Sequence, residues 1–304
     1  MTENGIPFRT WIDLALLALL WGGSFLAIRE ALDEIGFLSS VAHRVIWASI
    51  VLWMIVAVRR LAVPRSLRAW AAFFVMGCLN NVIPFSLMAW GQLSIESGLT
   101  AILNAATAVW GVLVAALFFA DERLTVRRVV GVAIGFLGVA TVIGLQNLAS
   151  LELRSLAQLA VIGGTISYAF AGCWARAMLP DQPPLVAAAG MLTCSGLVVL
   201  PLSWVAEGPL EFDLSPSTWA AIAYYALAAT AAAYVLYYRI LAAAGAGNLL
   251  LVTLMIPPIA ILLGSWARDE TLASGAYLGF ALLGAGLLVL DGRIGNVARN
   301  SVSR

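Results

Sequence analysis

Apolar stretches of roughly 20 residues, the length that one bilayer-spanning helix needs, alternate with short polar stretches along almost the whole chain. Ten such stretches follow one another, and charged residues are largely confined to the segments between them. The pattern predicts an all-α integral membrane protein with ten transmembrane helices. The predicted helices lie near residues 11–29, 38–58, 69–91, 97–120, 126–145, 155–178, 184–206, 217–240, 247–267 and 272–291.

Composition supports this prediction and excludes other classes of protein. Of the 304 residues, 62% are hydrophobic and 11% are charged, whereas soluble domains carry about 25% charged residues. The 17 basic and 16 acidic side chains give a formal net charge of +1 and form no basic face, which excludes a nucleic-acid partner. The expected partners are the lipid bilayer and a small-molecule substrate, and the chain is expected to be a monomer or a homodimer.

The placement of arginines predicts the orientation in the membrane. If the N-terminus lies inside, the inner segments hold 13 arginines and the outer loops hold three, with Arg44 within the second predicted helix. Because cytoplasmic loops are enriched in basic residues, both termini are expected in the cytoplasm. The first apolar stretch is too long for a removable signal and has no small-residue cleavage site. We therefore expect a multi-pass protein of the bacterial inner membrane.

The two halves of the chain resemble each other at an offset of 147 or 148 residues. Five predicted helices in each half is an odd number, so the second half must enter the membrane from the opposite side. The sequence thus predicts two inverted five-helix repeats, residues 1–148 and 149–304, around a central cavity. The matching residues are Asp121 and Glu122 with Asp269 and Glu270, Gly131 with Gly279, Gly138 with Gly286, and Arg29 with Arg176.

Several short motifs resemble those of a known transporter family. The run Trp21-Gly22-Gly23-Ser24-Phe25, Arg29, Arg44 and the two acidic pairs are similar to EamA-type proteins of the drug/metabolite transporter (DMT) superfamily, over nearly the whole chain. The resemblance implies export of small metabolites, often amino acids. Within the family, the sequence looks most like the YddG-type amino-acid exporters.

Few ionisable side chains lie inside the predicted spans. His43 and Arg44 lie well within the second predicted helix, whereas Asp13, near the start of the first, is expected to reach cytoplasmic water. No acidic residue lies near mid-depth, which disfavours exchange of a cation against protons. His43 is predicted either to bind substrate or carry a proton, or to be a neutral histidine bonded to a backbone carbonyl. For Arg44 we expect snorkelling or structural pairing rather than contact with a substrate carboxylate.

Uncharged polar side chains predict a lined cavity. Asn80 and Asn81 lie near the middle of the third predicted helix, one turn before Pro84, which frees a backbone carbonyl at the same depth. In the fourth predicted helix, a polar stripe at spacing i, i+4, i+7 and i+11 faces protein or water. Substrate contact is predicted for these residues, with hydrogen bonding between helices as the alternative. The stripe consists of Thr100, Asn104, Thr107 and Gly111.

Aromatic side chains deep in the spans are further candidates. Without a buried carboxylate, a substrate ammonium group could be held by ring faces and by amide or helix-end carbonyls. Such a site suits a zwitterion with an apolar or aromatic side chain, and ordinary packing is the alternative for each ring. The candidates are Trp21, Trp110, Tyr168, Trp174 and Tyr234.

Two short hairpins are predicted to be gates on opposite membrane faces. They comprise residues 92–96 outside and 239–244 inside, and irregular helix starts at residues 97–98 and 245–248 follow them. A proline pair in the ninth predicted helix is expected to kink or break it. The gating candidates are Trp90, Gln92, Gly98, Tyr237, Tyr238, Gly247, Pro257 and Pro258.

The sequence has no catalytic constellation, so we do not expect an enzyme, a cofactor or a metal site. We expect an exporter of amino acids, with neutral or aromatic side chains favoured, that works by alternating access and is facilitative or weakly proton-coupled. The alternative is export of other small amphipathic metabolites or drugs. The glycine pairs at 131 and 135 and at 275 and 279 predict close helix packing rather than a dimer interface.

Overall fold

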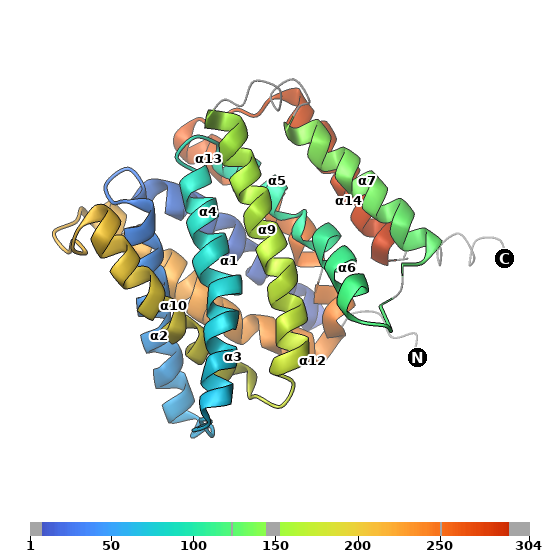
Figure 1. Ribbon diagram of the computed structural model, residues 1–304. Helices are drawn as coiled ribbons and strands as arrows, with labels where there is room; N and C mark the ends of the chain where they lie inside the picture. The colour runs from blue at the N-terminus through green and yellow to red at the C-terminus, as the bar shows by residue number, and fades with distance from the viewer. Residues whose placement is uncertain (1–7, 123, 144–152, 250, 292–304) are drawn as a thin grey trace.

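The computed structural model describes residues 8–122, 124–143, 153–249 and 251–291, and every regular element in these ranges is a helix (Figure 1). Two of the helical segments, η1 and η2, are π-helical. The elements are α1 (Phe8–Ala31), α2 (Phe37–Val58), α3 (Leu67–Gly77), η1 (Cys78–Val82), α4 (Ile83–Gly91), α5 (Ser97–Asn104), α6 (Thr107–Phe118), α7 (Val126–Ile143), α9 (Leu153–Met178), α10 (Pro184–Glu207), α11 (Pro216–Ala223), η2 (Tyr224–Ala232), α12 (Ala233–Leu249), α13 (Leu251–Arg268) and α14 (Ser274–Asp291).

The apolar stretches of the sequence coincide with these helices. Within the described residues, eight helical segments are long and apolar enough to cross a membrane, and two shorter apolar helices, Val252–Arg268 and Ser274–Leu290, follow them. The chain is therefore a multi-pass, all-helical membrane protein, and ten complete spans remain a prediction. The eight segments are Phe8–Ala31, Phe37–Val58, Leu67–Gly91, Ser97–Phe118, Val126–Ile143, Leu153–Met178, Pro184–Glu207 and Pro216–Ala243.

Two spans are locally widened into π-helix. In the third span, η1 ends directly before the start of α4, where Pro84 lacks an N–H and cannot complete an ordinary helical hydrogen bond. In η2, the hydroxyl of Thr230 donates to the carbonyl oxygen of Tyr225 at 2.7 Å, five residues earlier. Such π segments often lie at functional sites, because they turn side chains away from the regular helical positions.

The fourth predicted helix is interrupted. A turn at residues 105–106 separates α5 from α6, so the polar stripe expected along one continuous helix is divided between two helices. The Thr107 hydroxyl donates to the carbonyl oxygen of Asn104 at 2.7 Å across this turn. Threonine and asparagine favour such local bonds over continuous helix. The prediction of one regular stripe from Thr100 to Gly111 is therefore wrong in its geometry.

The inner hairpin expected at residues 239–244 is also wrong, because these residues belong to α12. The stretch from 242 to 246 is mostly alanine, the strongest helix former, so the helix continues through it. Gly247 accordingly lies within α12, and α13 begins only at Leu251. Pro257 and Pro258 lie inside α13, which remains helical around them.

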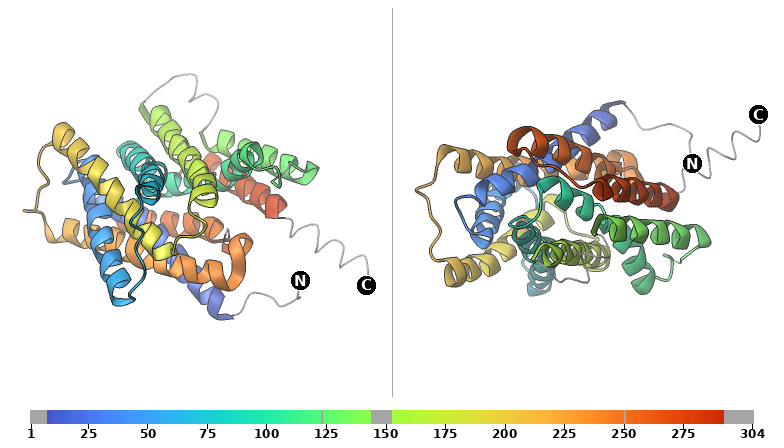
Figure 2. Two further views of the ribbon diagram at one scale, coloured as in Figure 1. Left: turned by 60° about the horizontal axis from the view of Figure 1, so that its bottom comes forward. Right: turned by 90° about the horizontal axis from the view of Figure 1, so that it is seen from above.

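Three apolar clusters hold the helices together. One lies where α2 packs against α10 and η2, a second surrounds α5, α7, α9 and α14, and a third joins α1 to α12 and α13. Figure 2 shows α2 beside α10 and, from above, α7 along α14. Burial of apolar side chains between helices thus fixes the positions from which polar side chains reach the interior.

Glycines bring α7 and α14 into backbone contact. A Cβ atom added at Gly138 would lie 2.8 Å from the carbonyl oxygen of Gly279, and one added at Gly131 would lie 2.9 Å from that of Gly286. The reverse additions at Gly279 and Gly286 would lie 2.7 and 2.8 Å from the carbonyl oxygens of Gly138 and Gly131. Only glycine permits this approach, so the predicted close packing of these two helices is confirmed.

Candidate functional site

Polar side chains from three helices meet between the spans. Asn80 of η1 donates from Nδ2 to the Tyr234 hydroxyl of α12 at 3.0 Å and to Asn81 Oδ1 at 3.3 Å. Asn81 is fully buried, and its Nδ2 donates to the hydroxyl of Ser195 in α10 at 3.0 Å. We call these four residues, Asn80, Asn81, Ser195 and Tyr234, the amide cluster. The predicted pair of asparagines is thus joined to the predicted Tyr234.

A path of aromatic rings leads from the amide cluster to α1. The rings of Tyr234 and Tyr238 are stacked with their centroids 6.4 Å apart, and Tyr238 meets Tyr237 edge-on at 5.2 Å. Tyr237 in turn lies 6.0 Å from Trp21. Two predicted binding residues and two predicted gating residues therefore form one continuous feature, the aromatic path, whose ring faces can attract a cation.

The motif that contains Trp21 packs tightly against the second half of the chain. A Cβ atom added at Gly22 would lie 2.7 Å from the Ile259 side chain in α13, and one added at Gly23 would collide with the Tyr224 hydroxyl in η2. The Tyr224 hydroxyl donates to the carbonyl oxygen of Leu19 at 3.0 Å. The two glycines thus let α1 approach α13 and η2 closely, which positions the Trp21 ring at the end of the aromatic path.

Arg44 projects into the helical bundle and is only 9% exposed. Its Nε donates to the Thr230 hydroxyl at 2.9 Å, and its guanidinium carbon lies 3.9 Å from the centroid of the Phe85 ring. Of the two expectations for Arg44, snorkelling is wrong, because the side chain packs inward against η2 and α4, whereas the hydrogen bond to Thr230 is a structural pairing. The electrostatic neighbours of the guanidinium group are the hydroxyls of Tyr168, Tyr225 and Tyr234.

His43 lies apart from the amide cluster. It is 1% exposed, and its ring meets the rings of Phe212 and Trp219 edge-on at 5.6 and 5.8 Å. Nδ1 accepts a hydrogen bond from Trp47 Nε1 at 3.3 Å, so the neutral ring carries its proton on Nε2. Nε2 is buried near the backbone of Glu211 but completes no hydrogen bond of good geometry with any described residue. This environment resembles the second predicted alternative for His43, a neutral histidine, rather than a residue that binds substrate or carries a proton.

The two threonine hydroxyls of α5 and α6 bond to nearby backbone carbonyls. The Thr100 hydroxyl donates to the carbonyl oxygen of Glu96 at 3.1 Å, as Thr107 does to Asn104. Trp110 meets Phe136 edge-on at 4.7 Å. Asn104 Oδ1 and Trp110 Nε1 are buried without hydrogen-bond partners among the described residues. The structure thus does not join these predicted residues to the amide cluster.

Two further predicted rings differ in their surroundings. Tyr168 of α9 packs against two of the apolar clusters and is an electrostatic neighbour of Arg44. Trp174 lies six residues further along α9. Its Nε1 donates to the carbonyl oxygen of Ala72 at 3.0 Å and so connects α9 to α3. Tyr168 therefore lies near the site, whereas Trp174 connects two helices.

The predicted outer hairpin lies between α4 and α5 and contacts other helices on both sides. Gln92 is buried, and its Nε2 donates to the carbonyl oxygen of Phe25 in α1 at 2.8 Å. Glu270, beyond α13, accepts hydrogen bonds from the Ser97 hydroxyl at 2.9 Å and from the Gly98 N–H at 3.4 Å. Trp90 packs against the second apolar cluster.

Carboxylates cap two more helices at the same end of the bundle. Glu207 accepts bonds from the N–H groups of Leu38 and Ser39 at the start of α2, at 3.0 and 2.8 Å. Glu34 accepts bonds from Ser215 and Thr218 at the start of α11. These bonds, the one from the Ser215 hydroxyl above all, lower the pKa of the Glu34 carboxyl below its ordinary value. Helix N-termini carry unpaired N–H groups that favour such anionic partners.

Ion pairs join helices at the opposite end. Asp13 is buried and paired with Arg239 of α12, so the expectation that it reaches cytoplasmic water is wrong. Both oxygens of its carboxylate accept from the guanidinium group. Arg176 of α9 pairs with Asp121 and Glu122 at the end of α6. The hydrogen bond from Arg176 lowers the pKa of Asp121.

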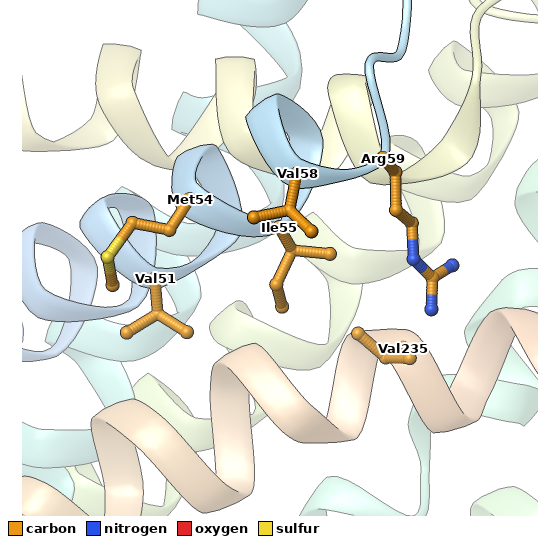
Figure 3. Close-up of a pocket in the computed structure, with 6 residues that line it drawn as sticks. All are labelled: Val51, Met54, Ile55, Val58, Arg59 and Val235. Carbon is orange, nitrogen blue, oxygen red and sulfur yellow. The ribbon is translucent and has the colours of Figure 1, made fainter.

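A hollow of about 360 Å³ lies between α2 and α12 (Figure 3). None of the predicted site residues lines it, and apolar side chains surround a single arginine there. Sequence reasoning missed Ser195 and Thr230, which hydrogen bond to Asn81 and Arg44. The lining residues of the hollow are Val51, Met54, Ile55, Val58, Arg59 and Val235.

Comparison with known proteins agrees with this architecture. The sequence model of the EamA-like transporter family matches residues 9–144 and residues 155–290. The "Uncharacterized transporter YwfM" of Bacillus subtilis (strain 168) is 30% identical over 133 residues, which is 44% of each chain, so the match spans less than half of that relative. One crystal structure has a similar fold, with a TM-score of 0.66 and 18% sequence identity over 92% of this chain and 96% of its own.

Proposed function

Because the chain belongs to the EamA-like transporter family and is a membrane transporter, we propose that it exports amino acids, with neutral or aromatic side chains favoured. The observation that carries this proposal is the amide cluster at one end of the aromatic path. Amide and hydroxyl groups can bind both charged ends of a zwitterion, and the rings can receive an ammonium group or an apolar side chain. The direction of transport is proposed from the resemblance to exporters.

The electrostatics of the described interior favour a zwitterion over a cation. Most ion pairs of the described residues lie at or beyond helix ends, and Asp13, which is buried within a helix, is already paired with Arg239. A cation without a carboxylate would therefore meet no free acidic partner among the described residues of the site. This supports facilitative or weakly proton-coupled transport.

Alternating access is proposed on the basis of contacts between the two halves at both ends of the bundle. Glu270 contacts Ser97 and Gly98 at one end, and Asp13 pairs with Arg239 at the other. In the proposed orientation, with both termini cytoplasmic, the first contact faces outward and the second inward. Opening one contact while the other stays closed would expose the site to one side at a time.

The glycine contacts of α7 and α14 support the proposed inverted repeats, 1–148 and 149–304. Gly131 and Gly279 occupy equivalent positions of the two halves, and so do Gly138 and Gly286. Gly131 contacts Gly286, whereas Gly138 contacts Gly279. This exchange is the pattern that a two-fold axis produces. Because α7 and α14 run antiparallel, the axis lies across both helices, in the plane of the proposed membrane.

The test is efflux from proteoliposomes that contain the purified protein and one labelled amino acid at a time, with and without a pH gradient. We expect saturable efflux of phenylalanine, leucine or similar amino acids that changes little with the gradient. Empty liposomes, and liposomes with the cross-linked protein described in the Discussion, are the controls. Efflux of amphipathic amines or drugs but of no amino acid would favour the alternative substrate class.

A further inference from the structure

We propose that Arg44 binds a carboxylate of the transported molecule, so that the transporter selects small molecules that carry this group. The proposal rests on the proposed function, since it names the chemistry by which the same site recognises its substrate. It assigns to Arg44 a role in selectivity, in place of the snorkelling or structural pairing that the sequence predicts.

Arg44 carries a buried charge with no acidic partner in the described part of the chain. None of the ion pairs there includes this residue, and its two contacts are the neutral Thr230 hydroxyl and the Phe85 ring. Guanidinium stays charged at any physiological pH. An unpaired charge inside a membrane protein is costly, and such residues commonly mark a substrate path. A bound anion would supply the missing partner.

The geometry leaves the appropriate donors available. The Nε group of Arg44 is used by Thr230, which fixes the plane of the guanidinium group, and the Phe85 ring covers one face. The two terminal nitrogens make no hydrogen bond to the described residues, yet they are not completely buried. They therefore keep some accessible surface at which a ligand can bind. Paired N–H donors of this kind match the two oxygens of a carboxylate.

The position of Arg44 relative to the amide cluster fits an α-amino acid. Tyr234 is an electrostatic neighbour of the guanidinium group and also accepts the hydrogen bond from Asn80. A carboxylate at Arg44 would thus lie beside the amide cluster and the start of the aromatic path. In an α-amino acid a single carbon separates the carboxylate from the ammonium group, so both groups need neighbouring sites. The aromatic path and the amide oxygens offer the second site.

The experiment measures ligand binding to the purified full-length protein by the shift of its melting temperature with ligand concentration. Each probe is compared with its amide: phenylalanine with phenylalaninamide, and 3-phenylpropionate with 3-phenylpropionamide. We expect each carboxylate to bind at least about 10-fold more tightly than its amide, since hydrogen bonds to a charged group are the stronger kind. In Arg44→Gln this preference should disappear, and in Arg44→Lys it should persist in part.

Two further variants separate charge recognition from folding. Thr230→Val removes the acceptor of Nε but leaves the charge, so it should keep the preference for carboxylates. Arg154→Gln removes an exposed arginine that pairs with Glu96 at a helix end, and it should change nothing in this assay. If Arg44→Gln does not fold, a reduced preference in Arg44→Lys tests the same residue, and equal binding of each carboxylate and its amide by the wild-type protein would still overturn the proposal.

The assignment is overturned if wild-type protein binds no carboxylate, binds amides equally well, or keeps its preference in folded Arg44→Gln. Stabilisation by inorganic phosphate but by no carboxylate would overturn it as well. The proposed function fails separately: carboxylate binding that depends on Arg44, without efflux of any amino acid, would retain the assignment and reject amino-acid export. Efflux of amino acids without a preference for carboxylates would retain amino-acid export and reject the assignment of Arg44.

Discussion

Tyr234 is the residue that joins the two parts of the candidate site. Its hydroxyl accepts from Asn80 at 3.0 Å, and its ring stacks on Tyr238 as the first ring of the aromatic path. It is also an electrostatic neighbour of Arg44. A single hydroxyl therefore connects the groups proposed to recognise the polar and the apolar ends of the substrate.

Replacing Tyr234 with phenylalanine removes this hydroxyl and retains the ring. We expect KM for amino-acid efflux to rise about 2- to 10-fold with little loss of stability, because only two neutral hydrogen bonds are removed, one from Asn80 at 3.0 Å and a long one to Asn81 Oδ1 at 3.5 Å. Tyr224→Phe is the matched control, since its hydroxyl bonds the carbonyl oxygen of Leu19 away from the amide cluster. An equal change of KM in both variants would argue against a local role for Tyr234.

Glu34 gives the molecule a defined acid sensitivity. Because hydrogen bonds lower its pKa in the folded protein, the carboxylate stabilises the fold above the ordinary pKa of glutamate, and this contribution is lost as the pH falls through the lowered value. Near pH 7, Glu34→Gln should therefore melt below wild type, and the gap should narrow as the pH drops below the ordinary value. Melting curves across that range measure the gap; a constant gap would contradict the assignment.

Part of the site could be read from the sequence, because asparagine and tyrosine are unusual at mid-span. Asn80, Asn81 and Tyr234 stand out against apolar neighbours, and the structure brings them together. Ser195 and Thr230 do not stand out, since single hydroxyls are common in membrane helices and usually bond their own backbone. The inward direction of the Arg44 side chain could not be predicted from the sequence either, because it depends on where η2 and α4 pack.

At the scale of whole helices, hydropathy located the elements well and their interruptions poorly. All ten predicted stretches overlap helices of the structure, because the free energy of burial in lipid depends on composition over many residues. The turn at 105–106 and the continuation of α12 to Leu249 depend instead on local hydrogen bonds and helix propensity. The π segments η1 and η2 fall in the third helix of each proposed repeat, at matching positions.

The contact between α7 and α14 makes a prediction at the scale of the element. Gly138→Leu would place a side chain against the backbone of α14, which should force the helices apart and lower stability by about 1–3 kcal/mol or more. Gly172→Leu is the control, because a Cβ atom there meets nothing within 4 Å. Thermal melting in detergent should separate the two variants. Equal melting temperatures would show that α7 and α14 tolerate separation.

At the scale of the whole molecule, the two halves are fastened to each other at both ends of the bundle. Ser97, Gly98 and Glu270 meet at the proposed outer end, and Asp13 meets Arg239 at the proposed inner end. A transporter that alternates must break each of these contacts once in every cycle. Both contacts consist of hydrogen bonds or an ion pair between polar groups.

Cross-linking tests this requirement. Cysteines at positions 97 and 270, in a background where Cys78, Cys173 and Cys194 are replaced by alanine, should be joined by a short thiol-specific cross-linker. Efflux should stop when the link forms and recover when a reducible link is cleaved. The same treatment of positions 13 and 239 should also stop efflux. In each single-cysteine variant, the cross-linker should not change the rate of efflux. Undiminished efflux with both links in place would exclude these contacts as gates.

The glycine contact between α7 and α14 also limits how the two halves can diverge. Gly131 contacts Gly286, and Gly138 contacts Gly279. In the proposed repeats, Gly131 is equivalent to Gly279 and Gly138 to Gly286. A side chain gained on one helix therefore cannot be accommodated by a smaller residue on the other, since nothing is smaller than glycine. In the proposed inverted repeats we therefore expect glycine at these positions in both halves, and a single five-helix copy inserted in both orientations would already carry a surface able to pair with itself.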